Sequence, residues 1–201
     1  MISRLFVLLF TVSVLMAMPN VRAQDISAIA DLKLLNTNGR WLAMNDFSDA
    51  RGFILIFTCN HCPFAKLYSK RLNDLHRYYA PQGVPLLAIN PMDTLEYDEE
   101  RFEFMVEKSA RDSFLFPYLQ DNLQLFARYM NAAHTPQAFI VWKNAGGWEV
   151  EYQGAIDDNG AEPEKAHSYI SEALDALLQH KKSPLPNTDS FGCRIYLRES
   201  K

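Results

Sequence analysis

The chain has 201 residues, of which 48% are hydrophobic and 22% are charged. This size fits one ordinary domain with a continuous apolar core, and the composition excludes a disordered or low-complexity protein. The formal net charge of -4 argues against a nucleic-acid partner, because binding a phosphate backbone requires a local stripe of Lys and Arg. The basic groups at 66–71 and 181–182 are too short and too far apart to form such a stripe.

The first 23 residues have the layout of a secretory signal peptide. Arg4 precedes an apolar run from Leu5 to Met18, and Val21-Arg22-Ala23 fits a small-x-small cleavage site. The apolar run of 14 residues is shorter than the ~20 that a spanning helix needs, which disfavours the alternative of an uncleaved anchor. We therefore predict cleavage after Ala23, export to the periplasm or the exterior, and no membrane span in the mature chain.

The rest of the sequence predicts one domain at 24–182, which opens with a β-hairpin. Apolar stretches at 31–35 and 40–44 flank an Asn-Gly pair at 38–39, and this pair is typical of tight hairpin turns. The segment 52–58 is an unbroken run of apolar, β-branched and aromatic residues. Such a run predicts a central strand that is buried on both faces.

A helix is expected directly after this strand, because apolar residues recur three and four positions apart. A second apolar strand at 84–90 follows it, and this strand–helix–strand order predicts parallel pairing. Residues 91–133 predict an inserted helical segment with an acidic stretch at 93–103. The acids favour helix initiation over a metal or partner site, since no loop glycine stands at calcium-site spacing. The apolar stripe of the first helix consists of Phe64, Leu67, Tyr68, Leu72, Leu75 and Tyr79.

An antiparallel hairpin and a closing helix are predicted to end the domain. Apolar runs at 137–142 and 148–152 flank a glycine-containing turn, and a helix with one apolar face begins at Pro163. Strands with helices before and between them give an α/β sandwich. The remaining tail, 183–201, contains an apolar segment that begins at Cys193, and we expect this segment to dock as an edge strand.

Two of the three cysteines, Cys59 and Cys62, stand two residues apart where the buried strand becomes a helix. One helical turn brings positions i and i+3 to the same side, so this pair can close a small disulfide. We predict that Cys59 faces the helix N-terminus, where backbone N–H groups and the helix dipole lower the pKa of a thiol. Cys59 is then the nucleophile, and Cys62 resolves the mixed disulfide.

Other residues modify this centre. His61, between the two cysteines, can stabilise the thiolate and make the disulfide a stronger oxidant; the alternative is a surface histidine without influence. Pro63 follows the pair at the start of the helix. For Cys193 we favour a buried apolar residue over a third redox partner that traps Cys59 or Cys62.

The order of strand, Cys-x-x-Cys-Pro and helix, with Thr135-Pro136 directly before the apolar run at 137–142, resembles the thioredoxin superfamily. The resemblance covers most of residues 30–180, and the inserted helix is similar to that of exported redoxin-like members of the AhpC/TSA type. It implies an α/β thioredoxin-like fold, here with an N-terminal hairpin extension. It also implies a thiol:disulfide oxidoreductase that acts on protein or peptide thiols with a partner redox protein and without a cofactor. The Thr135–Pro136 bond is implied to be cis, and both residues are implied to position the substrate.

The sequence departs from thioredoxin at two positions. Thr58 stands where the family has a Trp before the first cysteine, and Phe53 stands where it has a buried acid. We therefore expect no buried carboxylate that accepts a proton from Cys62. The direction of exchange, whether oxidation, reduction or isomerisation, is left open because it depends on the potential and on the electron partner.

Two other functions compete with disulfide exchange. Peroxiredoxins share the fold, but their peroxidatic cysteine follows a Thr by three residues. In this chain the residue three positions before Cys59 is Ile56, and the residue three positions before Cys62 is Cys59. Copper(I) binding by Cys59, Cys62 and His134 is similar to thioredoxin-fold copper chaperones, which usually space their cysteines by three residues. Both functions rank below thiol exchange, and we predict no resident metal.

Overall fold

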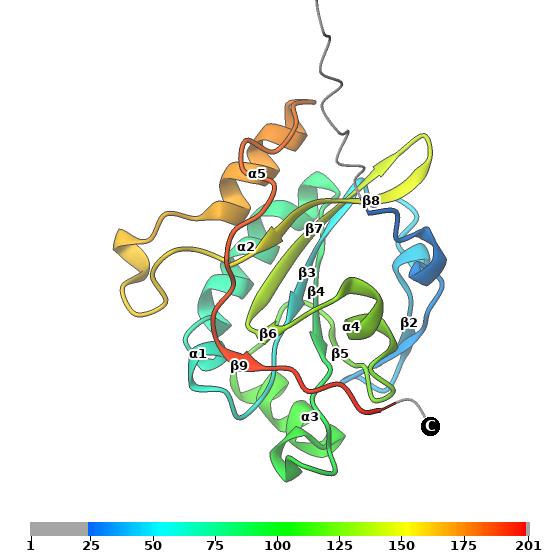
Figure 1. Cartoon of the computed structure of the whole chain (residues 1–201), viewed down its shortest axis with the longest axis vertical. Coiled ribbons are helices and arrows are strands. Elements are labelled where there is room, and N and C mark those ends of the chain that lie inside the picture. The colour runs from blue at the N-terminus through cyan, green and yellow to red at the C-terminus, as the bar shows by residue number, and fades with distance from the viewer. Residues whose placement is uncertain (1–23, 200–201) are drawn as a thin grey trace, which may run out of the picture.

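A computed structural model describes residues 24–199 of the chain. The described residues form a mixed seven-stranded sheet in the order β2-β1-β5-β4-β3-β7-β8, and a separate two-stranded sheet of β6 and β9 (Figure 1). The strands are β1 (Leu34–Asn36), β2 (Trp41–Leu42), β3 (Gly52–Phe57), β4 (Leu86–Asn90), β5 (Tyr118–Gln120), β6 (His134–Thr135), β7 (Gln137–Asn144), β8 (Gly147–Gly154) and β9 (Cys193–Arg194).

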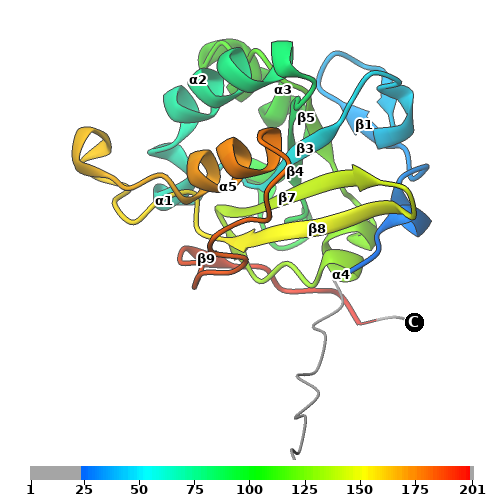
Figure 2. The ribbon, with the colours of Figure 1, turned by 90° about the horizontal axis from the view of Figure 1, so that it is seen from above.

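Helices cover both faces of the large sheet, as Figure 2 shows. The α-helices are α1 (Pro63–Lys66), α2 (Ser69–Tyr79), α3 (Phe102–Arg111), α4 (Leu125–Met130) and α5 (Tyr169–Leu178). Apolar residues of α2, α3 and α5 pack on one face, whereas those of α4 pack on the other. This is the α/β thioredoxin-like arrangement that the sequence predicts. Single turns of 3-10 helix are η1 (Ser27–Ile29), η2 (Met44–Asp46), η3 (Ala80–Gln82), η4 (Asp98–Glu100) and η5 (Pro163–Lys165).

Strand β3 is the centre of the sheet, and every one of its residues is buried. It pairs in parallel with β4 and antiparallel with β7. Its successive side chains enter two apolar clusters on opposite faces, with Phe53 and Leu55 in one and Ile54 and Ile56 in the other. The predicted parallel pairing is therefore confirmed, as are the two antiparallel hairpins β1–β2 and β7–β8.

The segment 91–133 is more than an insertion. It contains the predicted helices as α3 and α4, but it also contains β5, which pairs in parallel with β4 and antiparallel with β1. A strand of three residues is too short to show a period of two in the sequence. Tyr118 and Leu119 of β5 are nonetheless buried, so this segment completes the large sheet.

The bounds of two helices differ from the predicted ones. The helix after the cysteine pair is divided into α1 and α2, with Leu67 and Tyr68 between them. The closing helix begins at Tyr169 rather than at Pro163, because the hydroxyl of Ser168 accepts a hydrogen bond from the backbone N–H of Ser171 and caps it there. Pro163 begins the separate turn η5.

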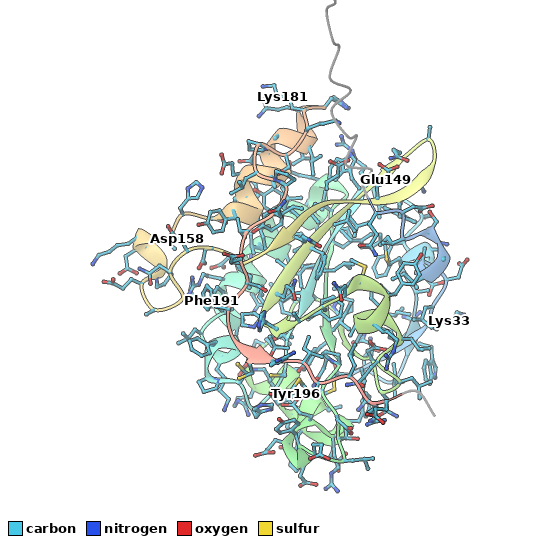
Figure 3. All side chains as sticks on the ribbon, viewed as in Figure 1. Lys33, Glu149, Asp158, Lys181, Phe191 and Tyr196 are labelled. Atoms are coloured by element: carbon cyan, nitrogen blue, oxygen red, sulfur yellow. The ribbon has the colours of Figure 1, made fainter. Side chains whose placement is uncertain are left out.

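The tail docks, and its segment from Cys193 forms the short strand β9, as expected. Residues 186–188 follow the outer edge of β8, where the backbone N–H of Gln153 donates to Pro186 and that of Thr188 donates to Gln153. The tail then crosses to β6, with which β9 pairs antiparallel. Farther on, the guanidinium of Arg198 forms an ion pair with Asp93. Figure 3 shows Phe191 and Tyr196 on the tail, on either side of β9.

The predicted signal peptide, residues 1–23, lies outside the described residues. Within residues 24–199, none of the helices is both long enough and apolar enough to cross a membrane.

Candidate active site

The two cysteines of the Cys-x-x-Cys segment follow the carboxyl end of β3. Both are free thiols, and both residues are 0% exposed. Cys62 is the N-cap of α1, and Pro63 occupies the first helical position. Proline fits there because its missing N–H has no partner at a helix start. The helix therefore begins at the second cysteine, and the backbone N–H of Cys62, at the helix N-cap, interacts with the Cys59 sulfur.

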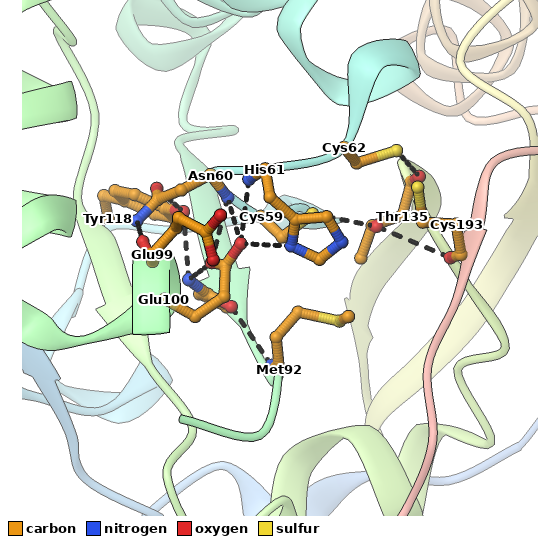
Figure 4. Close-up of polar contacts among 11 residues, drawn as sticks. Cys59, Asn60, His61, Cys62, Met92, Glu99, Glu100, Tyr118, Thr135 and Cys193 are labelled. Carbon is orange, nitrogen blue, oxygen red and sulfur yellow. Dashed lines mark hydrogen bonds and ion pairs between the residues drawn. The ribbon is translucent and has the colours of Figure 1, made fainter. Parts of the chain in front are cut away.

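Thr135, on β6, contacts both sulfurs. Its hydroxyl Oγ1 lies 3.1 Å from Sγ of Cys59 (Figure 4). Its carbonyl oxygen accepts a hydrogen bond from the Cys62 thiol, in its protonated form, at 3.1 Å. The Thr135–Pro136 peptide bond is cis, as the resemblance implies. The structure thus brings the predicted loop residues together with both predicted cysteines.

A buried carboxylate also lies at the site, beside Cys59 and in a different segment from Phe53. Glu100, at the end of η4, is 1% exposed. It accepts hydrogen bonds from the backbone N–H groups of Asn60 and His61 at 2.9 and 2.8 Å, and from Nδ2 of Asn90 at 2.6 Å. The sequence shows this residue only as one acid in an acidic stretch, where nothing separates it from its exposed neighbours.

Further hydrogen bonds fix the loop between the cysteines to β4 and β5. The amide of Asn60 donates to the backbone oxygen of Glu99 at 2.7 Å and accepts from the hydroxyl of Tyr118 at 2.9 Å. Asn90 donates to the same hydroxyl at 3.2 Å. The loop is therefore held by buried polar groups from segments far away in the sequence, which favours a single conformation.

His61 is not a surface histidine without partners. Its Nδ1 lies 2.6 Å from Oε1 of Glu100, and its ring stacks on Tyr97 with the centroids 4.5 Å apart. The side chain is 22% exposed. These contacts hold the ring beside the cysteine pair.

The thiols of Cys59 and Cys62 share a hydrogen bond, and it shifts their pKa values in opposite directions. The pKa of Cys62 lies well below its ordinary value because the Cys59 thiol donates to its sulfur. The side chain of Cys193 and the backbone N–H groups of Ala65 and Cys193 lower it further. The pKa of Cys59 is raised by its hydrogen bond to Cys62, by burial and by the charge of Glu100. A proton held on Cys59 therefore favours a thiolate at Cys62.

The geometry does not assemble the copper site considered from the sequence. Within residues 24–199, the group of side chains that could hold a metal ion is Cys59, His61 and Glu100, with ligand atoms within 4.8 Å of one another. His134 is not part of this group, and its Nδ1 lies 2.9 Å from the hydroxyl of Ser190. The oxygens of Glu100 already accept several hydrogen bonds, so they serve the loop as acceptors.

Cys193 is half-buried and packs against the apolar cluster that contains Cys59 and Cys62. It lies opposite Thr135 in the β6–β9 pair. Its side chain and its backbone N–H both interact with the sulfur of Cys62. Burial, followed by the contact with Cys62, raises the pKa of the Cys193 thiol.

A cysteine pair between a buried strand and a helix, against a cis-proline loop, defines a thioredoxin-fold protein with a thiol redox centre. Residues 26–146 match the model of the AhpC/TSA family, and the chain belongs to this family of redoxins. Membership supports thiol-based redox activity. A comparison with curated protein sequences gives no match.

Solved structures support the same fold. A hypothetical protein from Sinorhizobium meliloti is 27% identical, with a TM-score of 0.78, and the match covers 89% of this chain and 95% of that one. An uncharacterized conserved protein from Geobacillus kaustophilus is 32% identical, with a TM-score of 0.76 and coverages of 84% and 89%. The bacterioferritin comigratory protein of Xanthomonas campestris is 13% identical, with a TM-score of 0.54 and coverages of 79% and 94%. This last similarity concerns the fold alone.

Proposed function

We propose that the protein catalyses thiol:disulfide exchange on protein or peptide substrates through Cys59 and Cys62. The observation that carries this proposal is the position of the two sulfurs, each 3.1 Å from an atom of Thr135. Two neighbouring thiols can cycle between a dithiol and a disulfide without a metal or a cofactor. Membership of a redoxin family supports the same class of chemistry.

The acidity of the two thiols supports Cys62 as the attacking group. The Cys62 thiolate forms a bond to one sulfur of a substrate disulfide, and the other substrate sulfur leaves as a thiolate. Cys59 then loses its proton and attacks Sγ of Cys62. This step breaks the mixed disulfide, releases the second substrate thiolate and leaves a Cys59–Cys62 disulfide. The same steps in reverse oxidise a substrate dithiol, so the direction depends on the redox partner.

His61 and Glu100 are positioned to accept the proton of Cys59. The ligand atoms of the three side chains lie within 4.8 Å of one another. Because the pKa of Cys59 is raised, its deprotonation is the more demanding of the two thiol ionisations. Glu100 is a buried carboxylate hydrogen-bonded to His61, and it supplies a proton acceptor that the chain lacks at position 53, where it has Phe53.

Insulin reduction in the presence of dithiothreitol tests the proposal with three proteins. Wild type should accelerate the reaction, and Cys62→Ser should abolish the acceleration. Cys59→Ser combined with Cys193→Ser, which leaves no second thiol beside Cys62, should accumulate a mixed disulfide at Cys62, which mass spectrometry detects as added mass. No acceleration by wild type, or equal acceleration by both variants, would contradict the proposal. A mixed disulfide that accumulates at Cys59 in the Cys62→Ser protein would reverse the two roles.

Peroxide reduction is the second candidate, favoured by the family and by the thiolate at a helix start. In that reaction the Cys62 thiolate cleaves the O–O bond and becomes a sulfenic acid, and Cys59 attacks it to form the disulfide and water. The Thr135 hydroxyl contacts Cys59 rather than Cys62, which disfavours this route. Consumption of hydrogen peroxide or of an organic hydroperoxide no faster than by a free thiol would exclude it.

We also propose that the protein is exported. The pattern of residues 1–23 supports this, since a charged start, an apolar run and a small-x-small site are the parts of a signal peptide. Expression of the full chain with a C-terminal tag, followed by cell fractionation and N-terminal sequencing, tests the proposal. A mature chain that begins at Gln24 is expected, whereas a full-length cytoplasmic product would contradict export.

A further inference from the structure

The tail occupies the edge of β6 directly beside the cysteine pair (Figures 1 and 4). Cys193 lies opposite Thr135 in an antiparallel register. The preceding residue, Gly192, has a φ of +141°. A Cβ atom there would stand 2.1 Å from the carbonyl oxygen of Thr135, so this close approach requires glycine. The tail thus takes the edge where the resemblance places an extended substrate chain.

Contacts on both sides of β9 hold it there. Before the strand, the hydroxyl of Ser190 lies 2.9 Å from Nδ1 of His134. After the strand, the backbone N–H of Ile195 donates to Ala133 at 2.8 Å, and Ile195 itself is buried. The position of Cys193 is therefore fixed by contacts before and after β9 and does not rest on one contact.

Cys193 differs from the other two cysteines in its access to solvent. Cys59 and Cys62 are fully buried, whereas Cys193 is half-buried. Figure 4 shows the side chains of Cys62 and Cys193 directed to the same place beside the Thr135 carbonyl, and the two interact. A half-buried sulfur therefore lies next to a fully buried one.

We propose that Cys193 is a third redox cysteine, which exchanges with Cys62 and carries the disulfide between the buried pair and the surface. This inference rests on the proposed function of the pair. The Cys193 thiolate attacks Sγ of Cys62 in the Cys59–Cys62 disulfide, the Cys62–Cys193 bond forms and the Cys59–Cys62 bond breaks. Cys59 leaves as a thiolate and takes up the proton that Cys193 lost, so no oxidant or reductant is consumed. A substrate thiol then attacks Cys193.

Two full-length variants in a glutathione redox buffer test the exchange. Cys59→Ser leaves Cys62 and Cys193, and it should form an intramolecular Cys62–Cys193 disulfide that peptide mapping identifies. Cys62→Ser leaves Cys59 and Cys193 and is the matched control, because the structure places Cys193 against Cys62. We expect the ratio of bridged to glutathionylated protein to be at least about tenfold higher in the first variant, since only there are the sulfurs held together.

Wild type provides a measurement that does not depend on a variant folding. Partial oxidation, followed by rapid alkylation and peptide mapping, should yield both the Cys59–Cys62 and the Cys62–Cys193 linkages. Gly192→Ala should displace the tail, decrease the second linkage and speed the labelling of Cys62 by a maleimide by about tenfold, as expected when a local opening becomes easier. Absence of the Cys62–Cys193 linkage from wild type and from Cys59→Ser would overturn the inference.

Insulin turnover by wild type, measured in parallel, separates this inference from the proposed function. Turnover without any Cys62–Cys193 linkage would remove the role of Cys193 and leave the exchange activity of the pair. The linkage without turnover would remove the proposed activity on protein substrates, while the internal exchange would stand.

Discussion

Oε1 of Glu100 lies 2.6 Å from Nδ1 of His61 and 2.8 Å from the backbone nitrogen of the same residue. This buried carboxylate also accepts from the backbone of Asn60, so it orders the two residues that separate the cysteines. Because it comes from η4, the conformation of the redox loop depends on a turn about forty residues away.

Glu100→Ala should therefore destabilise the reduced protein. It leaves the buried N–H groups of Asn60 and His61 without an acceptor, at a cost of about 1–3 kcal/mol each. We expect the free energy of unfolding in urea to fall by about 3 kcal/mol. Glu99→Ala is the matched control, because that side chain is exposed and its loss should cost less than about 0.5 kcal/mol. Equal losses in the two variants would contradict this role of Glu100.

A second buried acid stabilises the junction between α2 and the loop after β8. Asp157 is 2% exposed, forms an ion pair with Arg71 and accepts from the hydroxyl of Tyr68 at 2.8 Å. Asp157→Asn keeps an oxygen for Tyr68 but leaves the guanidinium of Arg71 without its counter-charge, so we expect a loss of about 3 kcal/mol on unfolding in urea. Asp158→Asn, at the exposed neighbouring position, should change stability little. A loss below about 1 kcal/mol for Asp157→Asn would show that the pair is screened by solvent.

The sequence predicts those parts of the fold that depend on local patterns. The run at 52–58 identifies β3 because burial on both faces requires continuous apolar residues, and the Asn-Gly pair identifies the first hairpin. The cysteine pair and Thr135-Pro136 are recognisable from their spacing and order, and the structure places them in contact. These features are carried by residues that are adjacent or nearly adjacent in the chain.

The sequence does not predict the features that depend on contacts between distant segments. Glu100 is indistinguishable from its acidic neighbours until η4 packs against the cysteine loop. The acidity of Cys62 depends on where α1 begins and on Cys193, which β9 brings from the far end of the chain. A tail strand of two residues carries no periodic signal, so its pairing with β6 follows only from the tertiary structure.

The lowered pKa of Cys62 predicts a thiolate that persists below the usual titration range of thiols, which centres near pH ~8.5. A thiolate absorbs near ~240 nm, where a thiol does not. The absorbance of the reduced protein at this wavelength should therefore change with pH in acidic solution. Cys62→Ala should abolish this titration, whereas Cys59→Ala should move it upward because the Cys59 thiol is the main donor to Cys62.

The lowered pKa of Cys62 also makes the stability of the reduced protein depend on pH. A lowered pKa in the folded state stabilises the reduced protein above the pKa of the unfolded thiol, and this contribution is lost as the pH falls through the lowered value. The difference in urea stability between wild type and Cys62→Ala should therefore shrink on acidification. If Cys59→Ala abolishes the acidic titration and Cys62→Ala retains it, the order of acidity is the reverse of the one described above.

The hydroxyl of Thr135 gives the last prediction, because it acts on Cys59 and not on Cys62. It lies 3.1 Å from the Cys59 sulfur and stabilises its thiolate, which partly offsets the raised pKa of that thiol. Thr135→Val keeps the shape and the carbonyl oxygen but removes the hydroxyl, so the resolving step at Cys59 should slow. A hydrogen bond with a net contribution of about 1 kcal/mol corresponds to about a fivefold change in rate.

The measurement is the single-turnover release of glutathione from a mixed disulfide prepared at Cys62, with Cys193→Ser present in every protein so that only Cys59 can release it. Thr135→Val should release glutathione about fivefold more slowly than wild type, because the hydrogen bond to Cys59 is lost. Thr135→Ser retains the hydroxyl and is the matched control, so it should remain within about twofold of wild type. Equal release rates for the valine and serine variants would show that the hydroxyl does not assist Cys59, and the contact would then be one of packing alone.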